Sequence, residues 1–165
     1  MKIALEIAKA HKEWDNHKEI NKQVIKKAIS KTLARFDNLK NVKEYGVSIL
    51  LTDDEQMEGL NNKFRGNLGA TNVLSFPDIE LNWQHLLEFT PNVSYMYLGD
   101  IAFGYQIIRM EAANQGKSFE NHFIHLLVHS ALHLVGFDHQ DNESANVMEN
   151  LEIDILKEFA IPSPY

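Results

Sequence analysis

Short apolar or alternating segments of the chain predict four β-strands. In the first, Ile3, Leu5 and Ile7 alternate with polar or small residues, the pattern of a half-buried strand. Three more segments of this kind follow at residues 47–51, 73–76 and 95–103. Pro77 ends the third of these strands, because proline cannot donate a hydrogen bond to a neighbouring strand.

Apolar residues spaced three or four apart predict five helices. They cover about residues 18–36, 54–64, 106–115, 119–135 and 142–159. Residues 52–55, Thr-Asp-Asp-Glu, form a capping box before the second helix, and Ser118 is the expected N-cap of the fourth. Gly116 and Gly136 follow the third and fourth helices, where a glycine commonly ends a helix.

This mixture of strands and helices predicts a single α+β domain that covers residues 1–165. We expect a flexible loop at residues 65–71 and a loop with a short helix at 78–94. No apolar run is long enough to cross a bilayer, and the first residues lack the apolar core of a signal peptide. The expectation is therefore a cytoplasmic protein without a membrane partner.

The charge of the chain is unevenly distributed. The net charge is −7, which argues at first against a nucleic-acid partner. Residues 1–45, however, hold eleven Lys and Arg against six Asp and Glu, whereas residues 46–165 hold five against seventeen. The helix at 18–36 carries much of this basic charge. On charge alone we interpret it as a solvated surface helix, with a basic face for a polyanion as the alternative.

Three histidines form the strongest chemical signal. His129 and His133 are four residues apart, so one helix face presents both imidazoles. Gly136 can end that helix and turn the chain, after which His139 can close the site from a third direction. The chain has no cysteine, and three imidazoles without a fourth protein ligand are typical of a catalytic zinc. We predict one Zn²⁺ per chain, although nickel, copper or cobalt also suit these ligands.

Such a zinc has an open coordination position for water, and it lowers the pKa of that water to about 7. The spacing His-x-x-x-His-x-x-Gly-x-x-His also occurs in metzincin proteases. Those enzymes need a glutamate directly after the first histidine as general base, and this chain has Ser130 there. A metallopeptidase is therefore an alternative that lacks the residue its mechanism most needs.

Residues 129–139 resemble the signature of the YbeY family of metal-dependent endoribonucleases, His-Gly-x-Leu-His-Leu-x-Gly-Tyr/Phe-Asp-His. Ser130 stands where the family usually has glycine, so a small residue is kept. Two further blocks are similar to family blocks in the same order. The first is 61–65 followed by 71–77, and the second is the Leu-Gly-Asp-Ile-Ala segment at 98–102. Together these blocks span about half the chain.

The resemblance implies an α+β fold around a mixed sheet. It places the zinc site on the helix of the motif and on the chain turn that follows this helix. It implies His129, His133 and His139 as metal ligands and as catalytic residues, together with Arg65. The Arg65 guanidinium would bind substrate by contacting the phosphodiester oxygens, which gather negative charge during attack. The implied substrate is single-stranded ribosomal RNA rather than DNA. The implied activity is an endoribonuclease of 16S rRNA maturation and ribosome quality control that works on the small ribosomal subunit.

Four other polar residues lie in or near these motifs. His122 and His125 precede His129 on roughly the same helix face, and we interpret them as partly exposed helix histidines. His125 is also disfavoured as a ligand, because three successive helix turns diverge too far for one metal. Asp138 either orients a ligand histidine or caps the turn before His139. Asp100 is an unusual acid within a strand, which indicates a role in supporting a metal ligand or in hydrogen bonding. A zinc-containing ribosome-assembly factor without catalysis remains the second alternative.

Overall fold

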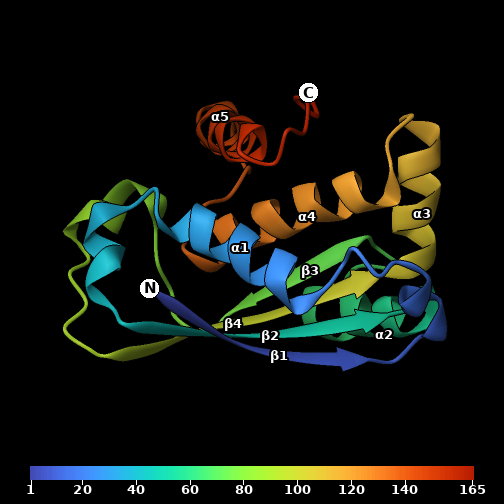
Figure 1. The fold of residues 1–165 in the computed structure, drawn as a ribbon, viewed down its shortest axis with the longest axis horizontal. Coiled ribbons are helices and arrows are strands. Elements are labelled where there is room, and N and C mark those ends of the chain that lie inside the picture. Colours follow the sequence, from blue (N-terminus) through green and yellow to red (C-terminus); the bar gives the residue numbers. More distant parts are fainter.

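Four strands form one mixed β-sheet in the computed structural model, which describes residues 1–165 (Figure 1). The strands are β1 Lys2–Lys9, β2 Glu44–Thr52, β3 Val73–Pro77 and β4 Tyr95–Gly104. Their order across the sheet is β1-β2-β4-β3. Strands β1, β2 and β4 are parallel to one another, and β3 runs antiparallel to β4 at the edge of the sheet. The predicted α+β fold with a mixed sheet is confirmed.

The helices occupy the segments in which the sequence predicts them. The α-helices are α1 Lys22–Leu33, α2 Asp54–Arg65, α3 Tyr105–Asn114, α4 Phe119–Leu134 and α5 Asn142–Lys157. Three short 3-10 helices join them, η1 Lys12–Asn16, η2 Asp37–Asn41 and η3 Trp83–Glu88. No helix has both the length and the apolar character needed to cross a bilayer.

Three predicted helix boundaries are wrong. The first helix begins after Asn21, whose side chain accepts hydrogen bonds from the backbone of Gln23 and Val24, so residues 18–20 lie outside it. It also ends at Leu33, before 36. The second helix is capped by Asp53, which accepts from the backbone N–H of Gln56. Thr52 cannot be that cap, because it is the last, fully buried residue of β2.

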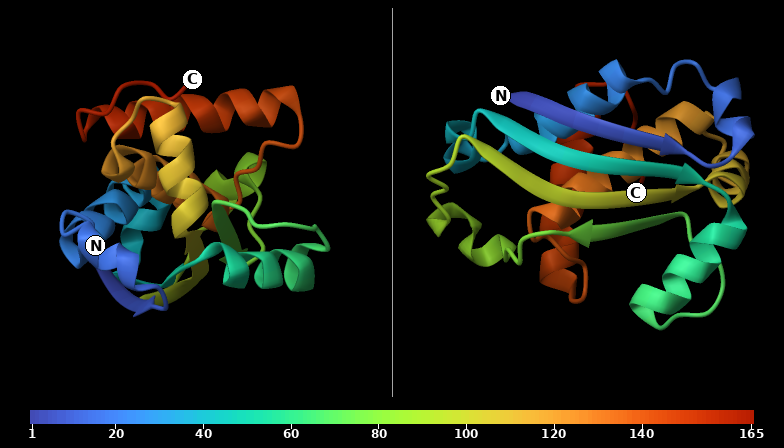
Figure 2. Two further views of the ribbon diagram at one scale, coloured as in Figure 1. Left: turned by 90° about the vertical axis from the view of Figure 1, so that its right-hand side faces the viewer. Right: turned by 90° about the horizontal axis from the view of Figure 1, so that it is seen from below.

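Helices cover the sheet unequally, and this inequality places the site. Helices α1 and α4 lie on one face, and α5 packs on the outer side of α4 (Figures 1 and 2). Along β4, Ile101 and Phe103 point into this main core, which contains 34 buried apolar residues. Ala102 points to the opposite face, where it packs with Met57 of α2. Helix α4 also packs against edge strand β3, so its last turn ends above that strand.

Gly136 determines how the chain leaves α4. Its φ of +96° lies in the left-handed region, and a Cβ there would be 2.5 Å from the carbonyl carbon of Leu81. Its carbonyl accepts a hydrogen bond from the backbone N–H of Trp83. The segment then runs to Asp141, which starts α5 through a reciprocal capping box with Ser144. The turn that carries His139 is thus held at both ends.

Candidate metal centre and cleft

The three predicted ligand histidines meet at the end of α4. His129 and His133 come from consecutive turns of that helix, and His139 comes from the segment after Gly136. One ring nitrogen of each lies within 4.8 Å of the others, and the Nε2 atoms of His129 and His133 are 3.0 Å apart. His129 and His133 are half-buried and His139 is exposed. The cluster therefore has a protected side and an open side.

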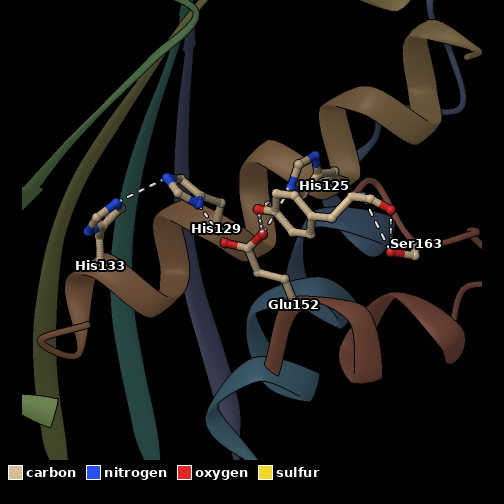
Figure 3. A network of polar contacts seen from close by, with 6 residues as sticks. His125, His129, His133, Glu152 and Ser163 are labelled. Carbon is tan, nitrogen blue, oxygen red and sulfur yellow. Dashed lines mark hydrogen bonds and ion pairs between the residues drawn. The ribbon is translucent and has the colours of Figure 1, made fainter. Parts of the chain in front are cut away.

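Both helix histidines have a fixed partner behind the ring. Nδ1 of His129 lies 2.5 Å from Oε1 of Glu152, and Nδ1 of His133 lies 2.8 Å from the backbone carbonyl oxygen of Phe137 (Figure 3). Because both partners are acceptors, each Nδ1 carries the proton and each Nε2 presents a lone pair to the cluster. Burial and the nearby His129 lower the pKa of His133 to about 4, so this ring is neutral at pH 7.

This donor set fits a zinc ion. Zinc–nitrogen bonds of about 2.0–2.1 Å in a tetrahedron hold ligand nitrogens roughly 3.3 Å apart, close to the spacing of the two helix imidazoles. The buried negative charge behind the two helix histidines is a second observation that fits a bound cation. The Glu152 side chain is fully buried, and its only ion-pair partners are histidines. Burial raises the pKa of this carboxyl, but hydrogen bonds from His125 and His129 outweigh burial and lower the pKa to about 2. A cation at the cluster would offset this buried negative charge.

A cleft of about 590 Å³ opens in front of the cluster. It is lined by His129, His133 and His139 on one side, and by Arg65, Ser75 and their neighbours on the other. All four predicted site residues therefore line one cleft. Asp138 is the only acidic residue that lines it, and no glutamate does. The cleft thus lacks the glutamate base that a metzincin-like peptidase requires.

Arg65 is positioned by the end of α2. The helix ends at Gly66, whose φ of +66° places it in the left-handed region. The Arg65 guanidinium donates a hydrogen bond to the carbonyl oxygen of Ser75 on β3, and its carbon lies 5.7 Å from the ring centre of Phe76. A carbonyl and an aromatic ring thus hold this cation at the rim of the cleft.

The remaining polar residues of the sequence analysis have different outcomes. His125 donates to Glu152 across 3.0 Å and is not part of the candidate ligand set, as predicted. His122 is not partly exposed: it is buried, because α3 packs on that side of α4, and its Nε2 lies 3.5 Å from Glu111. Asp138 accepts from the backbone of Gln140, which favours the capping interpretation.

Asp100 and Ser130 lie away from the cleft lining. Asp100 faces the α2 side of the sheet, opposite the cluster, and accepts a hydrogen bond from the Tyr97 hydroxyl. Its role is hydrogen bonding on that face, and it does not support a metal ligand. Ser130 is fully buried in α4, and its hydroxyl has no hydrogen-bond partner. The space behind the helix therefore accepts a small side chain larger than glycine.

Sequence reasoning missed Glu152 and Tyr165. Glu152 lies four residues after Met148 and three before Ile155, so it occupies a core position of α5. An acid within an apolar helix stripe was the available signal. Nothing in the sequence indicated the partner of Tyr165, whose hydroxyl donates to Oε2 of Glu152.

The fold and the site together define the class of protein: an α+β protein with a candidate metal centre in an open cleft. Residues 10–160 match the family model described as Endoribonuclease YbeY. The curated Endoribonuclease YbeY of Chelativorans sp. (strain BNC1) is 38% identical over 163 residues, which cover 99% of this chain and 93% of that protein. The chain belongs to the endoribonuclease YbeY family, and the predicted class of enzyme, a hydrolase acting on RNA, is confirmed.

A solved structure agrees in fold. The solution structure of TM1509 from Thermotoga maritima aligns with a TM-score of 0.55 over 95% of this chain and 92% of that one. The two sequences are 20% identical over the alignment, so the likeness concerns the arrangement of helices and strands.

Proposed function

We propose that this protein is a zinc-dependent, single-strand-specific endoribonuclease that acts in 16S rRNA maturation and ribosome quality control. Residues 1–165 would form its single nuclease domain. One observation carries the proposal: the nitrogens of His129, His133 and His139 converge in the same cleft as Arg65, in a chain of the endoribonuclease YbeY family. The relative from Chelativorans sp. is named an endoribonuclease, in line with this activity.

In this proposal His129, His133 and His139 hold one zinc ion. When bound, zinc supplies a Lewis acid and makes water a nucleophile near neutral pH. The chain's own part is to orient the substrate and the ligand rings. Arg65 would contact the nonbridging oxygens of the scissile phosphodiester and offset the charge that develops there. Glu152 and the Phe137 carbonyl oxygen would keep the two helix imidazoles in the tautomer that faces the ion.

Aromatic and basic side chains at the end of α2, next to Arg65 but on the α2 side of the sheet and outside the cleft lining, favour single-stranded RNA as substrate. Phe64 is half exposed and lies edge-on to Phe76, with 5.5 Å between the ring centres. The Lys63 ammonium lies 5.1 Å from the centre of the Phe64 ring. Unpaired bases can stack on such rings while cations contact the backbone, whereas paired bases remain in their own stack. A cation in the cleft and Arg65 would also make this region locally positive despite the net charge of −7.

Helix α1 is the proposed docking face for the small ribosomal subunit. Its Lys22 and Lys26 are exposed and form no ion pair in the structure. Lys31 pairs with Glu158 across 2.6 Å, so part of the basic charge is already neutralised by the end of α5. The docking proposal therefore rests on the first half of the helix. The proposed compartment is the cytoplasm, where ribosomes are assembled.

The test begins with metal analysis of protein purified without an affinity tag. We expect about one zinc per chain and cleavage of single-stranded RNA in preference to a duplex of the same sequence. His133→Ala should lose the metal and lower the cleavage rate by roughly 10³-fold, since a metal ion supplies several kcal/mol of transition-state stabilisation. Equal cleavage by wild type and His133→Ala would indicate a contaminating nuclease and refute the catalytic assignment.

Chelation of the metal separates the enzyme from the assembly-factor alternative. The main core of the domain lies between α1, α4 and the sheet, and Phe137 is its only buried member that also lines the cleft. We therefore expect the chelated protein to keep its circular dichroism spectrum while it loses cleavage. Global unfolding on chelation would instead indicate a zinc that only maintains the fold.

A further inference from the structure

A buried carboxylate behind the histidine cluster receives hydrogen bonds from two directions (Figure 3). From α4, His129 contacts Oε1 of Glu152 and His125 contacts Oε2. From the segment after α5, the Tyr165 hydroxyl donates to the same Oε2. Glu152 itself is fully buried. All the hydrogen bonds to this carboxylate thus come from one metal-ligand candidate and two residues that the proposed mechanism does not use.

The segment after α5 is built to bring Tyr165 to this place. Ala160 has a φ of +55°, and no other residue except glycine has a positive φ. This left-handed residue reverses the chain, and the Ile161 N–H then bonds to the carbonyl oxygen of Leu156. Ile161 is buried, and Ser163 exchanges hydrogen bonds with the backbone of Tyr165. The segment therefore folds back beside α5 and holds the Tyr165 ring next to His125, with 5.7 Å between ring centres.

The two oxygens of Glu152 have separate tasks. Oε1 accepts the Nδ1 proton of His129, and Oε2 accepts from His125 and Tyr165. A carboxylate held at Oε2 by two donors cannot rotate about its terminal bond without breaking those hydrogen bonds. Oε1 is therefore held at the Nδ1 atom of His129. Burial and the adjacent Glu152 raise the pKa of Tyr165, so its hydroxyl stays protonated and remains a donor.

We propose that Tyr165 and His125 are positioning residues for the metal centre, which act through Glu152 to fix the tautomer and ring orientation of His129. The proposal rests on the proposed function in one respect, the assignment of zinc to the three histidines. In the absence of the two donors, Glu152 can turn, and His129 can place its proton on Nε2, the atom that has to bind the ion. Outer partners of this kind change metal affinity by about 10- to 100-fold.

The test compares Tyr165→Phe with Tyr97→Phe. The first variant removes one hydroxyl and keeps the ring. The control removes a hydroxyl that also has two polar partners, Ser48 and Asp100, on the far face of the sheet. Zinc affinity is measured by competition with a chromophoric chelator. We expect roughly tenfold weaker binding for Tyr165→Phe, a larger loss for Tyr165→Phe combined with His125→Phe, and no change for Tyr97→Phe.

A second measurement separates positioning from a merely structural role. Nitrogen-15 NMR of the metal-free protein reports which imidazole nitrogen of His129 carries the proton. We expect Nδ1–H in wild type and Tyr97→Phe, and a mixture of tautomers in Tyr165→Phe. Unchanged zinc affinity with an unchanged tautomer would overturn the inference, even if the variant melts at a lower temperature.

The outcomes also separate this inference from the proposed function. A wild-type protein that binds no zinc would overturn both. Zinc binding that weakens in Tyr165→Phe, in a protein that leaves single-stranded RNA intact, would refute the nuclease and keep the positioning role. RNA cleavage by the wild type, with equal zinc affinity in Tyr165→Phe and wild type, would keep the nuclease and refute the positioning role.

Discussion

The histidine cluster has two sides that differ in nearly every physical respect. In front is an open cleft lined by polar side chains, with the exposed His139 and the exposed Arg65. Behind the cluster, Glu152 has no exposed surface and accepts hydrogen bonds from three side chains. We call Glu152 and its donors His125 and Tyr165 the wall. The front is shaped for a large anionic substrate that enters and leaves. The back is shaped to keep one ring in one orientation.

This difference predicts that binding of metal and turnover of RNA can be altered separately. Glu152, His125 and Tyr165 do not line the cleft, so changing them should weaken the candidate metal site and the fold. Residues of the front contribute little buried surface, so changing them should slow cleavage while metal content and stability remain. Each of the following substitutions tests this separation, from the largest expected effect to the smallest.

Glu152→Ala should have the largest effect on stability. It leaves the buried donors of His125 and His129 without an acceptor and opens a cavity beside α4. We expect the free energy of unfolding of the metal-free protein to fall by roughly 3–5 kcal/mol. Chemical denaturation measures this, with Glu149→Ala on the same helix as the control. A loss below about 1 kcal/mol would mean that the wall is not a tightly coupled unit.

Arg65→Ala tests the front of the site. The guanidinium is exposed, so its loss should leave the melting temperature and the zinc content unchanged. Cleavage of single-stranded RNA should slow by about 10²-fold, as for the loss of one donor to a charged transition state. Arg65→Lys should recover only part of the rate, because an ammonium cannot form two parallel hydrogen bonds. A fall in zinc content equal to the fall in rate would contradict the separation of front and back.

Phe64→Ala tests the exposed aromatic side chain next to Arg65 at the end of α2, which lies outside the cleft lining. If a base stacks on this ring, binding of single-stranded RNA should weaken by about tenfold, within the range for loss of one stacking contact. The equally simple control is Leu87→Ala, which removes an exposed apolar side chain on η3. Binding is measured by fluorescence anisotropy in the His133→Ala background to prevent cleavage. Equal affinities of the two variants would show that Phe64 does not contact the RNA.

Ser130→Ala should have the smallest effect, and it should be favourable. The hydroxyl is fully buried without a partner, and alanine has the higher helix propensity. We expect a gain of about 1 kcal/mol in the free energy of unfolding. Ser144→Ala provides the opposite case, because that hydroxyl belongs to the capping box of α5 and its loss should destabilise. Thermal unfolding in the presence of a chelator measures both; destabilisation by Ser130→Ala would indicate a hydrogen bond that the buried hydroxyl makes after all.

The convergence of the three histidines could be predicted because their geometry is local. A spacing of four residues places His129 and His133 on one helix face, and Gly136 allows the turn that returns His139. The interpretation of Asp100 could not be completed from the sequence. A strand exposes alternate residues to opposite faces, and only the pairing of Asp100 with Phe76 shows that it faces α2.

The sequence by itself determined the α+β class, most element positions, the three-histidine motif and the family resemblance. These depend on periodicity and on contacts within a few residues. Tertiary structure decided that Arg65 shares a cleft with the histidines, that His122 is buried and that Glu152 and Tyr165 stand behind His129. Each of these contacts joins segments far apart in the chain, and the packing of α2, α3 and α5 brings them together. Hydrophobic patterning shows that a helix face is buried, but it does not show which polar atom it meets there.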